Sequence, residues 1–309
     1  MKLISVVTGC YNEEENVELL AAAVQAVFTG LKDYDYEHIF IDNASEDKTF
    51  EVLKKMAQTN KKVKVIRNTR NFGHIRSPYH GMMQASGDAV ISLCADFQDP
   101  PEVIAEFIKK WEEGVKVVVG IKTQSDESPV MFRVRGLYYG LMNRISEVRH
   151  IENFTGFGLY DKRVIEILRK IEDPYPYFRG LIADIGFEIA RVEYRQAARK
   201  WGLTKNNFYS LYDIAMLGLT NYSKVPLRVA TFLGFAMSLV SLLVAVAYFI
   251  YKLIYWQEFS VGVAPIVIGL FFMFSVQLFF LGIVGEYIGS IHTKVLKRPL
   301  VVEKERINF

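Results

Sequence analysis

Two long apolar blocks constrain the fold of this chain more than any other feature. Residues 229–251 and 259–285 contain no Asp, Glu, Lys or Arg. Each block exceeds the ~20 residues that a helix needs to cross the core of a bilayer, and one charge at the centre of such a helix costs about 2.5–3.5 kcal/mol. We therefore expect a transmembrane hairpin over residues 226–290, with helices near 227–251 and 261–287. Two buried core helices are the alternative, and the length of the blocks argues against it.

The charges that flank the hairpin predict its orientation. The stretch 252–258 between the blocks has one lysine and one glutamate, whereas the basic residues outside them are Lys205, Lys224 and Arg228 before the first block and Lys294, Lys297 and Arg298 after the second. Because cytoplasmic loops carry the excess of Lys and Arg, we expect both termini, including a tail over 291–309, in the cytoplasm. This predicts a multi-pass protein of the cell inner membrane. A net charge of +3 is too small to indicate a nucleic-acid partner.

Residues 1–205 read as a separate cytoplasmic α/β domain. Short apolar segments typical of strands alternate with segments of helical periodicity, and the strands are expected at 2–8, 38–41, 63–66, 89–93 and 115–119. This alternation predicts a mostly parallel sheet with helices on both faces. In such sheets ligands bind beyond the carboxyl ends of the strands. Neither a G-x-G-x-x-G nor a G-x-x-x-x-G-K-[ST] motif follows a strand, which argues against dinucleotide and P-loop sites.

The stretch 88–102 is the strongest candidate for chemistry. An apolar strand leads into Asp96, Gln98 and Asp99, and Pro100–Pro101 then opens a helix. Carboxylate and amide oxygens suit Mg²⁺ or Mn²⁺, which bind through one or two carboxylates and substrate phosphates. Taken alone, the stretch favours a solvated, capped turn before a helix.

A resemblance to a known family favours the chemical interpretation. The motifs that carry it are 6–14 (VVTGCYNEE), 41–45 (IDNAS), 71–73 (NFG), 95–101 (ADFQDPP), 177–181 (YFRGL), 199–205 (RKWGLTK), 223–228 (SKVPLR), 282–289 (GIVGEYIG) and 297–299 (KRP). Their order and spacing resemble family 2 glycosyltransferases of the GT-A fold, in particular the polyisoprenyl-phosphate glycosyltransferases. This group includes the bactoprenol glucosyltransferases and the dolichol-phosphate mannose synthases.

The resemblance implies a reaction and a donor site. These enzymes transfer a sugar from a nucleotide sugar to the phosphate of a membrane polyprenol. It implies that Asp96 is catalytic and binds Mg²⁺ or Mn²⁺ together with Gln98, and that the donor contacts Gly9, Tyr11, Glu13, Asp42, Ala95 and Asp96. Asp42 could instead cap the following helix, and Gly9 could serve a tight turn.

The acceptor phosphate requires cations, because two anionic groups must approach each other. The resemblance implies that Arg199, as a catalytic residue, and Lys205 bind this phosphate, and Lys122 and Arg133 follow the fifth predicted strand. A solvated basic surface is the alternative for Lys122 and Arg133. A phosphate monoester, with a second pKa of about 6, is already anionic near neutral pH, so a strong general base is not obligatory.

The segment 206–225 is predicted to lie at the membrane surface. Apolar residues recur every three or four positions in it, as in an interfacial helix, although a core-packing helix would show the same pattern. Small residues in the first apolar block, Gly234, Ala236 and Ser238, fit a helix contact in a homo-oligomer or tolerance by the bilayer alone.

Three positions depart from the family pattern. Cys94 stands where the family often has the first Asp of an Asp-x-Asp motif, and Asn43 follows Asp42 where a second Asp is common. The segment 155–158 (TGFG) stands where many members place a candidate base. A thiol is a poor ligand for magnesium, which prefers hard oxygen donors.

These observations predict an inverting transfer of a sugar from a nucleotide sugar, UDP-linked and for example UDP-glucose, to polyprenyl phosphate. The product would serve modification of cell-envelope glycans from the cytoplasmic membrane face. Two alternatives stay open. One is a catalytically silent, membrane-anchored protein that binds a nucleotide sugar or acts as a scaffold, which the departures favour. The other is a processive polysaccharide synthase, which a Gln196–Trp201 segment favours.

Overall fold

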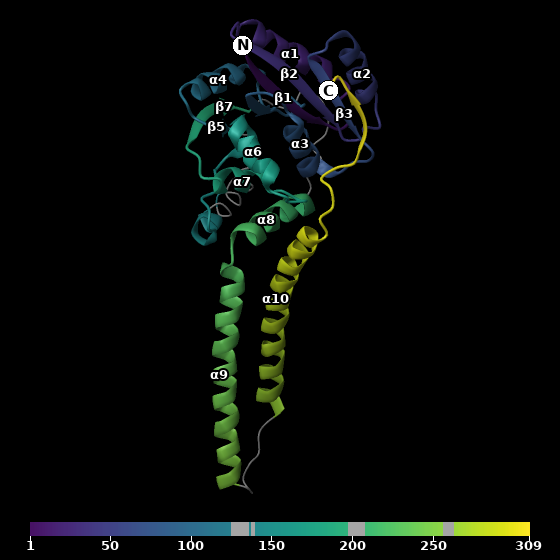
Figure 1. Ribbon diagram of the computed structural model, residues 1–309. Coiled ribbons are helices and arrows are strands. Elements are labelled where there is room, and N and C mark those ends of the chain that lie inside the picture. The colour runs from purple at the N-terminus through teal and green to yellow at the C-terminus, as the bar shows by residue number, and fades with distance from the viewer. Residues whose placement is uncertain (125–135, 137–139, 197–207, 256–262) are drawn as a thin grey trace.

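A computed structural model describes residues 1–124, 136, 140–196, 208–255 and 263–309 (Figure 1). Among these residues, eight strands form one sheet in the order β7-β5-β6-β4-β1-β2-β3-β8. The strands are β1 (Lys2–Cys10), β2 (Tyr34–Asp42), β3 (Val63–Asn68), β4 (Ala89–Ser92), β5 (Val117–Gln124), β6 (Phe154–Asp161), β7 (Ile189–Arg195) and β8 (Glu303–Ile307). The helices that accompany this sheet are α1 (Val17–Thr29), α2 (Thr49–Thr59), α3 (Gly73–Gln84), a 3₁₀ turn η1 (Pro101–Val103), α4 (Ile104–Glu112), α6 (Lys162–Lys170) and α7 (Phe178–Asp184).

The central strands confirm the prediction of a mostly parallel sheet. β4, β1, β2 and β3 pair in parallel, whereas β6 and β8 run antiparallel to their neighbours. The middle residues of β1 are almost all buried, as expected for a strand covered on both faces. In the β1/β2 register Cys10 lies opposite Asp42, so the carboxyl ends of these strands meet at one edge.

The helices form two layers on this sheet. One core cluster contains Leu20 of α1, Leu53 of α2 and Phe107 of α4. The other contains Tyr79 of α3 and Ile182 of α7, together with α6 residues. Both faces are therefore covered, and the edge formed by the carboxyl ends of the strands is left for ligands.

Two long apolar helices project away from the sheet (Figure 1). They are α9 (Val225–Ile254) and α10 (Val263–Val295), and α8 (Phe208–Tyr222) lies between them and the α/β part of the molecule. Among the described residues, two helices are long and apolar enough to cross a membrane. Their large apolar side chains are mostly exposed, as a bilayer-facing surface would be. The Tyr287 hydroxyl donates to the Ser223 carbonyl at 2.6 Å and ties α10 to the end of α8.

The chain after α10 returns to the sheet, which the sequence did not predict. The C-terminal segment runs from α10 along the α/β part to β8 (yellow in Figure 1). β8 pairs antiparallel with β3, and the Thr69 N–H donates to the Val302 carbonyl at 2.9 Å. The segment 291–309 thus contains the end of α10 and an edge strand of the catalytic sheet.

Candidate active site

The candidate site is built from the carboxyl ends of four parallel strands. Gly9 lies near the end of β1, Asp42 ends β2, Arg67–Asn68 end β3, and the loop 93–100 follows β4. An added Cβ on Gly9 would meet Pro78 Cγ of α3 at 2.7 Å, so only glycine allows this close approach of β1 and α3.

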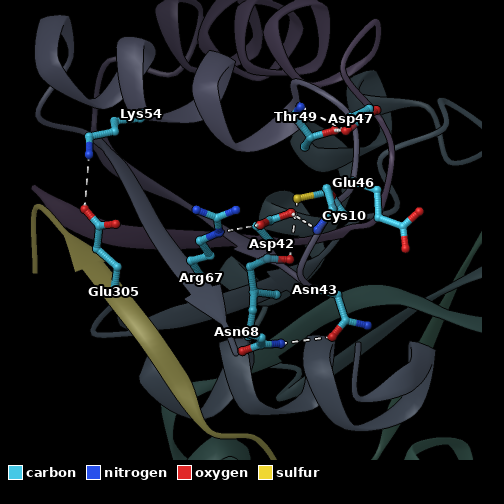
Figure 2. A network of polar contacts seen from close by, with 12 residues as sticks. Cys10, Asp42, Asn43, Glu46, Asp47, Thr49, Lys54, Arg67, Asn68 and Glu305 are labelled. Carbon is cyan, nitrogen blue, oxygen red and sulfur yellow. Dashed lines mark hydrogen bonds and ion pairs between the residues drawn. The ribbon is translucent and has the colours of Figure 1, made fainter. Parts of the chain in front are cut away.

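Asp42 is the most enclosed acid of the site (Figure 2). It is 0% exposed, and the Ser45 backbone N–H donates to its Oδ1 at 3.1 Å. Its Oδ2 lies 3.7 Å from Nε of Arg67 and has no hydrogen-bond partner among the described residues. Burial raises the pKa of Asp42, and the hydrogen bonds from Ser45 and the charge of Arg67 oppose that rise. The carboxylate therefore offers one buried acceptor atom to a donor on a ligand.

Asn43 explains one departure from the family pattern. Its Nδ2 donates to Asn71 Oδ1 at 2.8 Å and to the Gly73 carbonyl at 3.3 Å. Its Oδ1 accepts from Asn68 Nδ2 at 3.0 Å and from the Phe72 N–H at 2.9 Å. An amide can donate on one side and accept on the other, whereas an ionised carboxylate only accepts. Asn43 thus fixes the loop 71–73 that precedes α3, a task an aspartate could not perform.

The loop that carries Tyr11 and Glu13 is fixed by the loop after β2. Asn12 adopts a positive φ of 58°, its N–H donates to Ser45 Oγ at 3.0 Å, and its Oδ1 accepts from the Glu46 N–H at 2.9 Å. The Glu13 N–H donates to Thr49 Oγ1 at 2.8 Å. Glu13 Oε2 also accepts from Asn16 Nδ2 at 2.6 Å, just before α1, which gives Glu13 a local role at the start of that helix.

The loop after β4 presents oxygen ligands at the same edge. Asp96 is 8% exposed, its Oδ1 accepts from the Gln98 N–H at 3.2 Å, and Phe97 between them has a positive φ of 59°. Ala95 is buried, whereas Cys94 is exposed. Within the described part of the chain, no group of three or more His, Cys, Asp or Glu side chains could hold a metal ion. One carboxylate and one amide oxygen instead fit an Mg²⁺ or Mn²⁺ ion that arrives with substrate phosphates.

Asp99 and Tyr194 form a contact that the sequence did not single out. The Tyr194 hydroxyl donates to Asp99 Oδ1 at 2.6 Å, and the Tyr194 ring packs edge-on against Phe157. Burial raises the pKa of Asp99, and Tyr194 opposes the rise. Because Tyr194 is on β7, this bond ties the loop after β4 to β7. No local sequence signal could have revealed a pair 95 residues apart.

The predicted acceptor cations are only partly described. Lys122 lies on β5, and its Nζ donates to Gln196 Oε1 at 3.4 Å. Arg133, Arg199 and Lys205 lie outside the described residues, as does most of the segment Gln196–Trp201. A further cation, Arg76 on α3, has its guanidinium 5.3 Å from the centre of the Tyr175 ring.

The segment 155–158 has a conformation suited to glycine. Gly156 adopts a φ of +111°, and a Cβ on Gly158 would lie 2.5 Å from the Val118 carbonyl oxygen. The Tyr160 hydroxyl donates to the Gly156 carbonyl at 2.8 Å. The strand β6 therefore has no room for an acid at Gly158, and at Gly156 an acidic side chain would be strained.

The sequence profile described as glycosyl transferase family 2 matches residues 5–169. An uncharacterised glycosyltransferase of Synechocystis sp. is 35% identical over 298 residues, which cover 96% of this chain and 93% of that protein. A bactoprenol glucosyl transferase derived from the SfII prophage of Shigella flexneri is 32% identical over 303 residues, which cover 98% of this chain and 97% of that protein.

A solved structure shows the same fold. A mycobacterial protein of known crystal structure aligns with a TM-score of 0.51 at 17% identity and covers 71% of this chain and 73% of its own. At this identity the likeness concerns the fold alone.

Proposed function

The chain belongs to glycosyl transferase family 2, and we propose that it transfers a sugar from a UDP-linked donor, such as UDP-glucose, to the phosphate of a polyprenyl phosphate. The products are a polyprenyl-phosphate sugar and a nucleoside diphosphate. The observation that carries this proposal is the alignment with a bactoprenol glucosyl transferase over 98% of the chain, which includes both long apolar helices.

The surroundings of Asp42 at the end of β2 favour a nucleotide as part of the donor substrate. Asp42 Oδ2 is a buried acceptor without a hydrogen-bond partner among the described residues, and it lies beside Arg67. An acceptor beside a cationic donor complements the N–H and carbonyl edge of a base such as uracil. Gly9 and Tyr11, at the end of β1 next to this acid, would contact the same nucleoside.

The diphosphate side of the donor would lie at the loop after β4. Asp96 and Gln98 would hold the divalent cation, Mg²⁺ or Mn²⁺, with Ala95 next to them. Such a cation, when bound, neutralises the charge that develops on the leaving diphosphate. Asp96 keeps a carboxylate at the site, and the Gln98 N–H fixes its orientation.

The acceptor phosphate would act as its own nucleophile. An oxygen of the phosphate attacks the anomeric carbon as the bond to the nucleoside diphosphate breaks, so in-line attack inverts the configuration. The phosphate is already anionic near neutral pH, since its second pKa is about 6. The glycine conformation at Gly156 agrees with a reaction that needs no carboxylate base there. Lys122, Arg133, Arg199 and Lys205 would reduce the repulsion between the two anionic substrates.

The position of α8 supports access from the membrane surface. α8 lies between the α/β part and the two apolar helices (Figure 1), so it would rest on the bilayer and keep the site near lipid headgroups. With the Lys and Arg flanks described above, the catalytic domain and both termini would be cytoplasmic at the inner membrane, and the lipid-linked sugar would serve cell-envelope glycans.

Sugar transfer from a panel of radiolabelled nucleotide sugars to undecaprenyl phosphate tests this function. The full chain in detergent is assayed with Mg²⁺, with Mn²⁺ and with chelator. We expect a single sugar on the lipid, dependent on the cation and lost in Asp96→Asn. Asp88→Asn is the matched control, because Asp88 precedes the same strand and binds the Leu3 N–H far from the edge.

The alternatives have distinct outcomes in this assay. A nucleotide sugar that binds without transfer would favour the silent-scaffold function, with Cys94 as the cause. A polymer in place of a single lipid-linked sugar would favour a processive synthase. Either result overturns the proposal.

A further inference from the structure

The C-terminal strand β8 meets the sheet at the end of β3. Arg67 lies opposite Glu305 and Asn68 lies opposite Glu303, so Lys304 is an extra residue in β8 and forms a bulge. A bulge re-aims side chains and is frequent next to functional sites. The bulge lies at the two residues of β3 that contact the end of β2.

These two residues of β3 contact Asp42, the last residue of β2, and Asn43, which directly follows it. Arg67 Nε lies 3.7 Å from Asp42 Oδ2, and Asn68 Nδ2 donates to Asn43 Oδ1 at 3.0 Å (Figure 2). Asn68 Nδ2 also donates to Ser77 Oγ of α3 at 3.0 Å. Because neighbouring residues of a strand point to opposite faces, Arg67 and Asn68 support Asp42 and Asn43 from the two sides of the sheet.

The side chain of Arg67 contacts Asp42 and the Phe50 ring of α2. Its guanidinium lies 4.0 Å from the centre of the Phe50 ring of α2. Glu305 is its cross-strand neighbour on β8, and Glu305 is itself paired with Lys54 of α2 at 3.4 Å. At 3.7 Å the Arg67 guanidinium attracts Asp42 electrostatically and leaves Oδ2 without a direct hydrogen bond.

The C-terminal strand is itself firmly attached. Glu303 pairs with His80 of α3 at 2.5 Å, Arg306 NH2 donates to Gln84 Oε1 at 2.8 Å, and Asn308 Nδ2 donates to the Val63 carbonyl at 2.9 Å. The segment that leaves the membrane helix α10 is therefore built into the sheet next to Asp42.

We propose that Arg67 is a positioning residue for the donor nucleotide, that it orients Asp42 toward the nucleobase, and that β8 fixes the end of β3 that carries Arg67 by pairing with it. This inference rests on the proposed function. According to this inference, β8, which follows α10, supports the donor site in addition to covering the edge of the sheet.

The charges around Asp42 give the inference its pH dependence. Arg67 faces Asp42 from β3, Asp47 from the loop after β2 and the Cys10 thiol from β1, and the Ser45 N–H donates to it. Burial and Asp47 raise the pKa of Asp42, whereas Arg67 lowers it. Removal of Arg67 therefore moves protonation of Asp42 to higher pH, and a protonated carboxyl binds the base N–H less well.

Binding of UDP to the full chain in detergent, measured by calorimetry from pH 5 to pH 8.5, tests the proposal. Arg67→Met should weaken UDP binding near neutral pH by about tenfold, with affinity recovering toward high pH. Arg67→Lys should restore part of the affinity and the wild-type pH profile. With saturating donor, the kcat for sugar transfer should change little in either variant.

Two substitutions on β8 test the role of that strand. Glu305→Lys, which puts a cation opposite Arg67, should weaken UDP binding by about threefold, whereas the exposed Lys304→Gln should leave it unchanged. A wild-type pH profile in Arg67→Met, or an affinity loss that is equal at every pH, would overturn the inference. If the wild-type protein binds UDP and transfers sugar while these variants match it, only this inference fails. If the wild type neither binds UDP nor transfers sugar, the proposed function fails first.

Discussion

Asn43 after β2 and Cys94 after β4 each stand where an acid is common in the family, and the two residues have opposite surroundings. Asn43, directly after β2, is 5% exposed, and both ends of its amide are engaged with Asn68, Asn71 and the loop before α3. Cys94, after β4, is exposed on the loop that carries Asp96. The first departure is thus part of a buried amide network, whereas the second leaves the loop after β4 with fewer oxygen donors for the proposed cation.

The difference suggests how the two substitutions can be tolerated. At Asn43 an amide performs a structural task for which an acid would be unsuitable. At Cys94 the chain depends on Asp96 and Gln98, and the remaining ligands would come from substrate phosphates and water. We call the ends of β1 and β2, with Asp42 and Asn43, the donor half of the site, and the loop after β4, with Asp96 and Gln98, the metal half. The donor half is therefore expected to be rigid and intolerant of substitution, and the metal half is expected to be adaptable.

The first prediction has the largest expected effect and distinguishes the roles of Asp96 and Asp42. Asp96→Asn should lower kcat by about a thousandfold, because it removes the charged ligand at the developing diphosphate. Asp42→Asn should mainly raise the KM for the donor, by about tenfold, since it weakens one buried contact to the base. Steady-state kinetics with varied donor measure both. Equal losses of kcat in the two variants would contradict the division between a donor half and a metal half.

The second prediction exchanges Asn43 for the acid that is common in the family. In Asn43→Asp a carboxylate oxygen would face Asn71 Oδ1 and the Gly73 carbonyl, both of which are acceptors. We expect a loss of about 2–4 kcal/mol in stability, measured by denaturant unfolding in detergent. Asn43→Ala is the control, and its smaller loss would show that the charge is the cause. A stable Asn43→Asp variant would mean that the network is not obligatory.

Much of the fold follows from the sequence, and the exceptions have physical reasons. The five expected strands and the helices between them are present, because each buries a continuous apolar run or stripe. β6 was missed since Gly156 and Gly158 interrupt its pattern. β8 was missed because its residues are mostly charged, as suits an edge strand.

The sequence predicted the location of candidate residues only where a motif marks them. Asp42, Asp96 and Gln98 follow strands directly, so the pattern of strand and polar loop placed them at one edge. Arg67, Asn68 and Tyr194 act through partners far away in the chain, such as Asp99 for Tyr194. Their roles depend on the order of strands in the sheet, which no local pattern in the sequence reveals.

The third prediction restores the acid at Cys94. Cys94 is exposed, so Cys94→Asp can supply another hard oxygen ligand next to Asp96. Its carboxylate also replaces a thiol that hydrogen-bonds the buried Asp99, and it would repel that acid until a cation is bound. We expect the concentration of Mg²⁺ for half-maximal activity to fall by about fivefold. Cys94→Ser, which supplies a weaker neutral ligand, is the matched control. An increase in the required Mg²⁺ would indicate that the thiol has a role of its own in this loop.

The smallest expected effect concerns the acid stability of the donor half. His38 on β2 is buried, contacts Thr8 Oγ1 at 3.0 Å through Nε2, and burial lowers its pKa from 6.5 to about 3. Since the folded state binds the proton less well than the unfolded chain, the stability from neutral His38 is full above pH 6.5 and is lost as the pH falls toward 3.

Between pH 7 and pH 6 this loss should amount to about 0.7 kcal/mol, and His38→Gln should remove it from the pH profile of unfolding. Thr8→Val is the informative control, because it deletes the same hydrogen bond without removing a titratable group. It should lower stability equally at both pH values and leave the slope unchanged. If His38→Gln keeps the wild-type slope, the acid sensitivity arises elsewhere, and the donor half is not the region that acid unfolds first.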